Sequence, residues 1–321
     1  MQIFFREDNN WQQIPGNNLG GSMTVGLYLS AEQDIYVCDF AMGLFKTSDL
    51  GQQWTGVGEL INEGCSAFNI HSNRTMFVGM TYTGIGFIHR SLDDGVTWEG
   101  IPLPDYDSNY PVEHIEFDSQ GNIYLGTING VYKSGDFGES WNKMNFGLDG
   151  VQVSAFFIDE NDYLYVYTTY SSLSDGMYIS TDYANSWEII PIPDYYVVGI
   201  AAKHDMIVII DGDNHIQSSE DMGNTWNIMD EGLNDSYLTN LYLGHDDFMY
   251  SGGRYIHQTN ESFSLLGDLN FDQLINVLDV TLLIQMILGD IDILDNADMN
   301  MDNIVNIQDV ILLINIIINE L

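Results

Sequence analysis

A repeated octapeptide ending in tryptophan is the feature that most constrains how this chain can fold. The six tryptophans are spaced 43, 44, 43, 46 and 39 residues apart, and the last five each end a copy of the pattern Ser/Thr-x-Asp-x-Gly-x-x-Trp. The copies are TSDLGQQW (47–54), SLDDGVTW (91–98), SGDFGESW (134–141), STDYANSW (180–187) and SEDMGNTW (219–226). One copy departs from the pattern, with Ala184 in the glycine position. Such a fixed period predicts a fold built from repeated supersecondary units.

The residue types of the octapeptide predict a tight β-hairpin turn. Glycine supplies a positive φ angle, the Asp and Ser/Thr side chains bond neighbouring backbone groups, and the tryptophan is expected to pack against the next unit. The octapeptide resembles the Asp-box of sialidase-type (BNR) repeats. In that family it joins the two outer strands of a β-propeller blade, so the resemblance implies a scaffold role at the blade periphery.

A second hairpin is predicted in each period, because two alternating apolar runs flank a polar turn upstream of each octapeptide. These six inner hairpins lie at 27–39, 68–80, 115–127, 156–168, 200–211 and 241–253. Each period therefore contains four short strands, which is one propeller blade.

The predicted fold is an all-β propeller of Asp-box blades over residues 1–266. Degenerate outer hairpins at 3–14 and 255–266 bring the outer hairpins to seven, which gives six full blades plus an N-terminal half-blade. The ring is either six-bladed, closed by the N-terminal hairpin in place of 255–266, or seven-bladed and missing its first inner hairpin. We favour the second, because residues 1–11 also lack the pattern of a signal peptide, as expected for an N-terminally truncated chain.

Residues 267–321 form a second predicted domain, in which a loop with regularly spaced oxygen-bearing residues occurs twice, 30 residues apart. Side chains at loop positions 1, 3, 5, 9 and 12, with the backbone carbonyl at position 7, are typical of EF-hand-type calcium coordination. The first loop offers Asp268, Asn270, Asp272, Leu274, Asn276 and Asp279, and the second offers Asp298, Asn300, Asp302, Ile304, Asn306 and Asp309. The pattern predicts two bound Ca²⁺ ions.

The paired loops, each followed by one helix (277–288 and 307–318), resemble a type I dockerin. That family has Asp at position 12 and no helix before the loop, as here. Position 6, often glycine, is Gln273 and Asn303; because Asn adopts left-handed geometry more readily, the first loop is expected to bind calcium more weakly.

The resemblance implies a small all-α domain that folds with calcium and binds a cohesin on a scaffold or cell surface. Recognition in the family involves loop positions 10 and 11. These positions are Val277 and Leu278 in the first repeat and Ile307 and Gln308 in the second. Because the two pairs differ, the two-way binding of symmetric dockerins is not expected.

Composition excludes several classes of protein. With 47 acidic and 8 basic side chains, the net charge is −39 and the basic residues are scattered, which excludes nucleic acid and anionic membrane surfaces as partners. No run of 18 apolar residues predicts a membrane-spanning helix. Cys38 and Cys65 are predicted to be two buried free thiols rather than one disulfide, and the seven histidines show no metal-ligand spacing.

Two blade-connecting segments, 101–114 and 190–198, share the motif Pro-x-Pro-Asp-Tyr. Paired carboxylates can act on a glycosidic bond, and tyrosine faces stack on sugar rings. The weak candidates are Asp105 and Asp194 for acid–base catalysis and Tyr106, Tyr110, Tyr195 and Tyr196 for substrate binding. The interpretation that we favour for each segment is a rigid, solvated, Pro-rich connector.

Two functions of different classes remain open. The first is a secreted, non-catalytic propeller that binds glycan or protein within an extracellular or cell-surface polysaccharide-processing assembly and is anchored through its dockerin. The alternative is a glycoside hydrolase that uses channel-facing aspartates. A sialidase is disfavoured, because the chain has only four arginines and no Arg-Ile-Pro motif, and a xyloglucanase of the family would need two propellers.

Overall fold

The structure is a computed structural model. It describes residues 3–7, 10–14, 24–30, 34–61, 64–80, 87–104, 111–148, 152–169, 176–193, 196–203, 206–229, 238–243, 249–253, 256–258, 267–270, 274–289, 294, 297–300 and 304–319.

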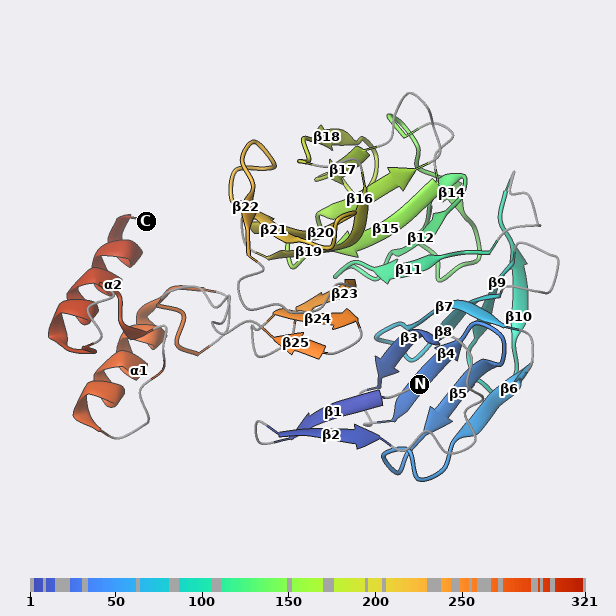
Figure 1. Cartoon of the computed structure of the whole chain (residues 1–321), viewed down its shortest axis with the longest axis horizontal. Helices are drawn as coiled ribbons and strands as arrows, with labels where there is room; N and C mark the ends of the chain where they lie inside the picture. Colours follow the sequence, from blue (N-terminus) through green and yellow to red (C-terminus); the bar gives the residue numbers. More distant parts are fainter. Residues whose placement is uncertain are drawn as a thin grey trace. The chain divides into compact units, whose positions relative to one another are not determined.

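Five four-stranded antiparallel sheets, each a propeller blade, make up most of the described chain (Figure 1). In every sheet the four strands follow one another in chain order from one edge to the other. The blades are β3 (Thr24–Leu29), β4 (Ile35–Asp39), β5 (Gly43–Thr47) and β6 (Thr55–Ile61); β7 (Cys65–Ile70), β8 (Met76–Met80), β9 (Phe87–Ser91) and β10 (Glu99–Pro102); β11 (His114–Phe117), β12 (Ile123–Thr127), β13 (Gly130–Ser134) and β14 (Asn142–Lys143); β15 (Gln152–Ile158), β16 (Leu164–Thr169), β17 (Gly176–Ser180) and β18 (Glu188–Ile190); β19 (Val197–Lys203), β20 (Met206–Asp211), β21 (Ile216–Ser219) and β22 (Asn227–Ile228).

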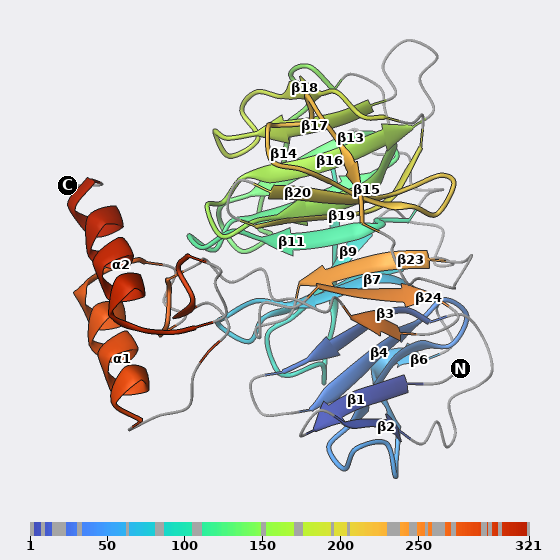
Figure 2. The same cartoon turned by 60° about the vertical axis from the view of Figure 1, so that its left-hand side comes forward.

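The first strands of these blades, β3, β7, β11, β15 and β19, contact one another in that order. They form the inner edge of the blades, while the fourth strands lie on the outside (Figures 1 and 2). A three-stranded sheet follows, formed by β23 (Leu238–Leu243), β24 (Met249–Gly253) and β25 (Ile256–Gln258), and β1 (Ile3–Glu7) pairs with β2 (Asn10–Ile14) near the start of the chain.

The six predicted inner hairpins and the N-terminal hairpin are all present as paired strands. The Asp-box blades are thus confirmed for five sheets, and the choice between a six- and a seven-bladed ring stays a prediction.

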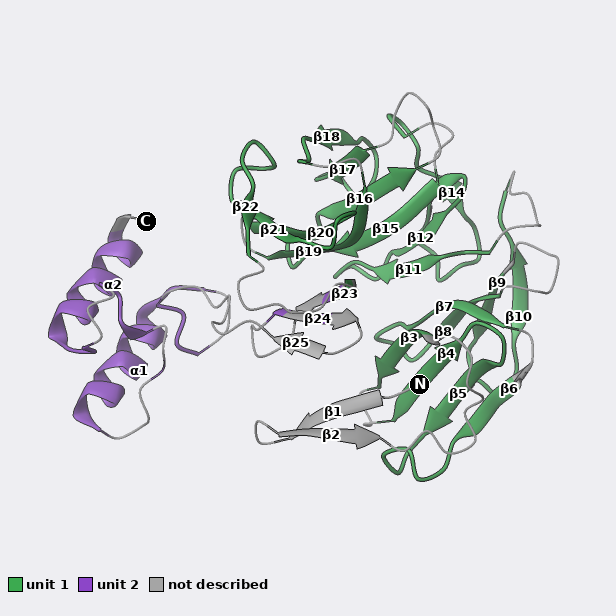
Figure 3. Cartoon of the chain, viewed as in Figure 1, with its two compact units in different colours: residues 1–240 green, residues 241–321 purple. Residues whose placement is uncertain are grey.

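Two helices, α1 (Val277–Leu288) and α2 (Ile307–Asn319), lie side by side near the C-terminus, and α1 has the predicted bounds (Figures 1 and 2). No helix in the described part of the chain is long and apolar enough to cross a membrane. By compactness the chain divides into residues 1–240 and 241–321 (Figure 3). The domain limits 1–266 and 267–321, taken from the change in composition, stay a prediction.

Each Asp-box turn is closed by the same hydrogen bonds. In the third box the Ser134 hydroxyl accepts from the Gly138 amide at 2.8 Å and donates to Asp136 at 2.7 Å, and the same carboxylate oxygen accepts from the Ser140 amide at 2.9 Å. The equivalent bonds occur in the other four boxes. Hydrogen bonds to the ionised carboxylate lower the pKa of Asp49, Asp93, Asp136 and Asp221.

The turn also explains the glycine at position 5 of the box. Positions 4 and 5 both have positive φ angles, for example 58° at Phe137 and 84° at Gly138. At Gly223 a Cβ atom would lie 2.4 Å from Ile190 Cγ2, so neither the backbone conformation nor the space admits a side chain. Ala184 is the exception, with φ of 67° and a methyl group buried in the blade core.

From the second Asp-box on, the box tryptophan packs against the preceding blade, so the prediction that it packs against the next unit is wrong. Trp54 of the first box packs within its own blade, with Ile35, Val37 and Phe45. The Trp187 indole N–H donates to the Met144 carbonyl at 2.8 Å, and that of Trp226 donates to the Pro191 carbonyl at 2.9 Å. Both carbonyl groups lie in the blade that comes before, because the turn directs the tryptophan toward that sheet.

Two basic side chains, Arg90 and Lys133, each join their blade to the following one. Arg90, which is 6% exposed, donates to the carbonyl of Phe137 in the next Asp-box at 2.7 Å and pairs with Glu99 and Glu139. Lys133 donates to the carbonyl of Tyr183 at the same place in the following box, at 3.2 Å. Some of the scattered basic residues thus act between blades.

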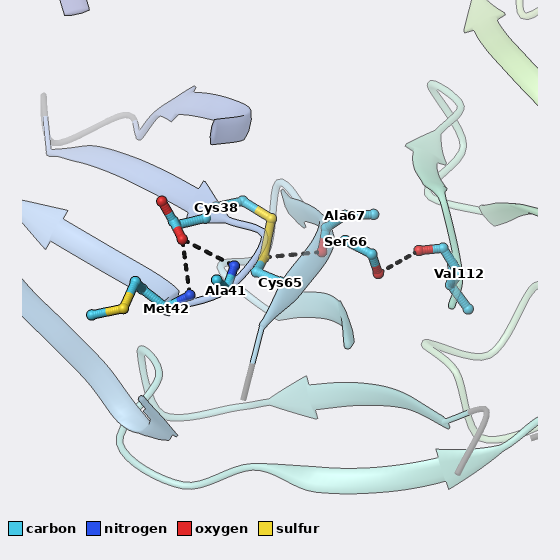
Figure 4. The surroundings of a disulfide bond; sticks show 8 residues. Cys38, Ala41, Met42, Cys65, Ser66, Ala67 and Val112 are labelled. Carbon is cyan, nitrogen blue, oxygen red and sulfur yellow. Dashed lines mark hydrogen bonds between the residues drawn. A yellow bond between two sulfur atoms is a disulfide. The ribbon is translucent and has the colours of Figure 1, made fainter. Parts of the chain in front are cut away.

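Cys38 on β4 and Cys65 on β7 form a buried disulfide bond with their Cα atoms 5.3 Å apart (Figure 4). The prediction of two free thiols is therefore wrong. The cysteines are 27 residues apart in sequence, and only the contact between the first and second blades brings them together.

Replacing Ser134 with alanine is expected to lower the free energy of unfolding by about 1–2 kcal/mol, because the Gly138 amide and the Asp136 carboxylate lose their common partner. Ser134→Thr is the control, because threonine (Thr47) occupies this position in the first box. Its free energy of unfolding should stay within about 0.5 kcal/mol of that of the wild type. Urea denaturation measures both variants. Equal losses would show that the hydroxyl group does not stabilise the turn.

The Cys38→Ser/Cys65→Ser variant is expected to lose about 3–4 kcal/mol, because the unfolded chain regains the entropy of a loop closed across 27 residues. Urea denaturation of the variant and the oxidised wild type gives the difference, and mass spectrometry of proteolytic peptides verifies the bond. An unchanged free energy of unfolding would contradict a stabilising role.

Candidate functional site

In each of the two C-terminal loops, backbone amides donate hydrogen bonds to a buried aspartate at position 12. The Asp279 carboxylate accepts from the amides of Leu269 at 2.8 Å, Asn270 at 3.2 Å and Asn276 at 2.8 Å. Asp309 does the same in the second loop, accepting from Met299 at 2.9 Å and Asn306 at 2.7 Å. These bonds fold the start of each loop back onto the start of the following helix.

The residue at position 9 begins each helix. Asn276 is the N-cap of α1, where its side chain accepts from the Leu278 amide at 2.8 Å and Asp279 completes a capping box. Asn306 accepts from the Gln308 amide at 2.8 Å in the same way. The Asn276 and Asn306 amide groups also donate to the position 7 carbonyls of Leu274 and Ile304. Positions 7, 9 and 12 of each loop are therefore drawn together.

Whether these residues can hold a metal ion depends on how the negative charge of their buried carboxylates is compensated. Asp268, Asp279 and Asp309 are almost completely buried, with exposed fractions of 3%, 0% and 0%, and residues 267–321 contain no Lys, Arg or His. An ionised carboxylate is expensive to bury unless positive charge compensates it. Carboxylate, amide and carbonyl oxygens are the ligands of calcium, so the residues fit a calcium ion. Asp272 and Asp302 lie outside the described residues, as do Gln273 and Asn303.

The predicted partner-binding residues lie at the exposed beginnings of both helices. Val277, Leu278 and Ile307 have exposed fractions of 69%, 57% and 63%, and Gln308 is also exposed. An aliphatic stripe continues along each helix through Ile284, Leu288, Ile311, Ile314 and Ile318. The opposite faces meet in a core that includes Val280, Leu283, Val310 and Leu313. A contiguous exposed apolar face of this kind is typical of a protein-binding surface.

Most of the propeller candidates cannot be placed. Asp105, Tyr106, Tyr110, Asp194 and Tyr195 lie outside the described residues. Tyr196, the exception, is 49% exposed, and its ring meets that of Tyr167 edge to face with the centroids 5.9 Å apart. An exposed ring held by another aromatic ring is suited to stacking on a ligand.

The structure adds ionisable groups on β11 that the sequence analysis did not select. Burial raises the pKa of Glu116 to about 8 and lowers that of His114 to about 4, and burial also raises the pKa of Glu113. Perturbed groups of this kind gather at functional sites. Alignment of the inner hairpins gives a signal for them, since His114 stands where four of the other five hairpins have alanine or glycine and the sixth has Asn240.

Comparison with known proteins gives separate results for the two parts of the chain. A family profile described as the dockerin type I domain matches residues 266–318. The xyloglucanase Xgh74A of Acetivibrio thermocellus is 27% identical over 254 residues, which cover 63% of this chain and 30% of the relative. The chain thus spans less than a third of that relative.

Solved structures with the same fold include an ancestral GH74 enzyme, with a TM-score of 0.58, 17% identity and coverage of 81% of this chain and 41% of that one. A catalytically inactive variant of virginiamycin B lyase from Staphylococcus aureus has a TM-score of 0.61 at 14% identity, covering 80% and 87% of the two chains. At these identities the likeness shows the propeller fold alone.

Proposed function

We propose, from a type I dockerin at residues 266–318 and a β-propeller related to GH74 and BNR-type repeat proteins, that this chain is a secreted component of an extracellular polysaccharide-processing assembly. A dockerin implies attachment to a cellulosome through a cohesin. The propeller, residues 1–266, acts as a glycan- or protein-binding module, and residues 267–321 anchor it. The observation that carries the proposal is the pair of dockerin loops with buried aspartates.

Each loop binds one Ca²⁺ ion. Type I dockerins generally bind calcium, and the loop residues offer the oxygen ligands that calcium requires. The ligands are Asp268, Asn270, Asp272, the Leu274 carbonyl, Asn276 and Asp279 in the first loop, and Asp298, Asn300, Asp302, the Ile304 carbonyl, Asn306 and Asp309 in the second. The ion compensates the buried carboxylates and fixes the N-terminus of the helix that carries the recognition residues.

The cohesin partner presents an apolar face to this dockerin. Val277, Leu278 and Ile307 are exposed, and residues 267–321 offer no basic side chain for an ion pair with the partner. The apolar contacts at these positions supply binding free energy that depends little on salt concentration, and any ion pair with the partner must use an acidic side chain of this domain.

The second candidate function is hydrolysis of a glycosidic bond, with Asp105 and Asp194 as acid and base. The similarity to a xyloglucanase over 63% of the chain supports it. The binding module is favoured, because the assignment of Asp105 and Asp194 as acid and base rests on a sequence motif alone.

Removal of calcium is expected to unfold residues 267–321 and to leave the propeller folded, because the buried carboxylates lose their counter-ion. Circular dichroism of the full chain with EDTA and with excess Ca²⁺ measures the loss of helix, and pull-down on a panel of type I cohesins measures binding. Asp279→Asn and Asp309→Asn should each weaken cohesin binding at limiting calcium, whereas Asp213→Asn, in an exposed propeller turn, should not. Helical signal and cohesin binding that survive EDTA would refute the calcium proposal.

Wild-type protein is expected to bind a neutral polysaccharide such as xyloglucan without releasing reducing sugar. Affinity electrophoresis and a reducing-sugar assay in the presence of calcium measure the two activities. If reducing sugar is released, and Asp105→Asn and Asp194→Asn abolish the release, the hydrolase is correct and the binding module is not. Neither binding nor release would leave protein binding as the only role of the propeller.

A further inference from the structure

The inner strand of the third blade breaks the repeat at two neighbouring positions on one face. At the register position of His114 the other four blades have Gly26, Ala67, Ala155 and Gly199. At the register position of Glu116 they have Tyr28, Asn69, Phe157 and Ala201. Only β11 has two ionisable side chains there. Departures from an internally consistent pattern are expected at functional sites.

His114 is held in one orientation by the fourth blade. Its imidazole is hydrogen-bonded to the Ser154 backbone and packs against the rings and methyl groups of Phe156 and Val153 around Gly126. Because burial lowers the pKa of His114 to about 4, the imidazole is neutral near pH 7. One ring nitrogen of a neutral imidazole donates a hydrogen bond and the other accepts one.

Glu116 stands two residues further along the same face of β11. The residue as a whole is half-buried, and no hydrogen bond joins its carboxyl group to the described residues. Burial raises the pKa of Glu116 to about 8, so the group is a neutral carboxylic acid at pH 7.

We propose that His114 and Glu116 form a binding site for an uncharged, hydroxyl-rich ligand, of the class of a neutral polysaccharide chain, at the inner edge of the blades. The proposal rests on the glycan-binding role proposed above and places that role on β11 instead of the connecting segments. Glu116 donates a hydrogen bond to a ligand hydroxyl, and His114 accepts one.

The charge of the protein selects an uncharged ligand. A net charge of −39 repels polyanionic glycans, and a protonated carboxyl group offers no negative charge to a cation. A carboxylic acid beside a neutral imidazole presents one donor and one acceptor, which matches the two hydrogen bonds that neighbouring sugar hydroxyls can make.

The expected pH dependence follows from the groups that face Glu116. Tyr124, the cross-strand neighbour of Glu116 on β12, has a raised pKa and stays protonated through pH 9.5, as does Tyr28 on β3, and His114 stays neutral above pH 6. β7 and β15 contribute no ionisable side chain apart from the disulfide-bonded Cys65. Beyond the two tyrosines, Lys133 and Asp118 contact Tyr124, and Glu113 on the same chain segment is hydrogen-bonded to Gln152.

The test measures binding of xyloglucan, xylan and galactomannan by the full chain with calcium, at pH 6.5 and pH 9.5. For whichever of the three polysaccharides binds, the affinity of the wild-type protein should fall about tenfold from pH 6.5 to pH 9.5, because a carboxyl group of pKa about 8 is ionised at the higher pH. Glu116→Gln keeps a neutral donor and should bind equally at both pH values. Glu116→Ala and His114→Ala introduce residue types found at the same register in other blades, and each should weaken binding about tenfold. Glu188→Gln, on an exposed outer strand, is the matched control.

The possible outcomes distinguish failure of the proposed site on β11 from failure of the glycan-binding role. Binding that is unchanged in Glu116→Ala and His114→Ala overturns the site and leaves glycan binding intact. A pH dependence that persists in Glu116→Gln also overturns the role of Glu116, because Glu113 or another group must then cause it. Wild-type protein that binds none of the three polysaccharides at either pH overturns both the site and the glycan-binding role.

Discussion

Two consecutive residues in the left-handed conformation, held by one hydroxyl group and one carboxylate, determine how each blade meets its neighbour. The Ser134 hydroxyl and Asp136 satisfy the amides of the turn, and the turn then directs Trp141 toward Ile101 and Leu103 of the preceding blade. The carbonyl at position 4 of the box points the same way and accepts from Arg90 or Lys133. Local turn chemistry thus creates the interface between blades, which explains why the five boxes vary so little.

The aspartates of the chain are stabilised in two chemically different ways. In the propeller, backbone amides and hydroxyl groups satisfy them, both in the Asp-boxes and in the inner-hairpin turns, where the buried Asp118 and Asp159 each accept from two backbone amides and one tyrosine hydroxyl. In the C-terminal loops amides also bind the buried Asp279 and Asp309, but each loop contains several aspartates within twelve residues, and residues 267–321 contain no basic side chain. Hydrogen bonds therefore suffice for the aspartates of the propeller turns, whereas the accumulated negative charge of the C-terminal loops adds the need for a cation.

Features that depend on local chemistry could be predicted from the sequence. The Asp-box turns, the six inner hairpins and the bounds of α1 follow from turn residues, alternation and the Asn276 cap, each encoded within about a dozen residues. The Cys38–Cys65 bond and the direction of tryptophan packing could not be predicted, because they depend on which blades become neighbours and on the face that each turns toward the other. The calcium-loop residues belong to the first class. The departure of His114 and Glu116 from the repeat is also visible in the sequence, but their burial belongs to the second class, because it depends on the neighbouring blades.

The repeat itself separates scaffold from function in this propeller. A residue shared by all blades, such as the box aspartate, stabilises the fold of every blade, so its presence does not indicate a ligand site. The fold does not require His114 and Glu116. Other blades form the same strand pair with alanine or glycine at the first position and asparagine or alanine at the second. Their burial costs stability that the fold does not require. That unneeded cost makes β11, more than the Pro-x-Pro-Asp-Tyr connectors, the place where a ligand must be sought.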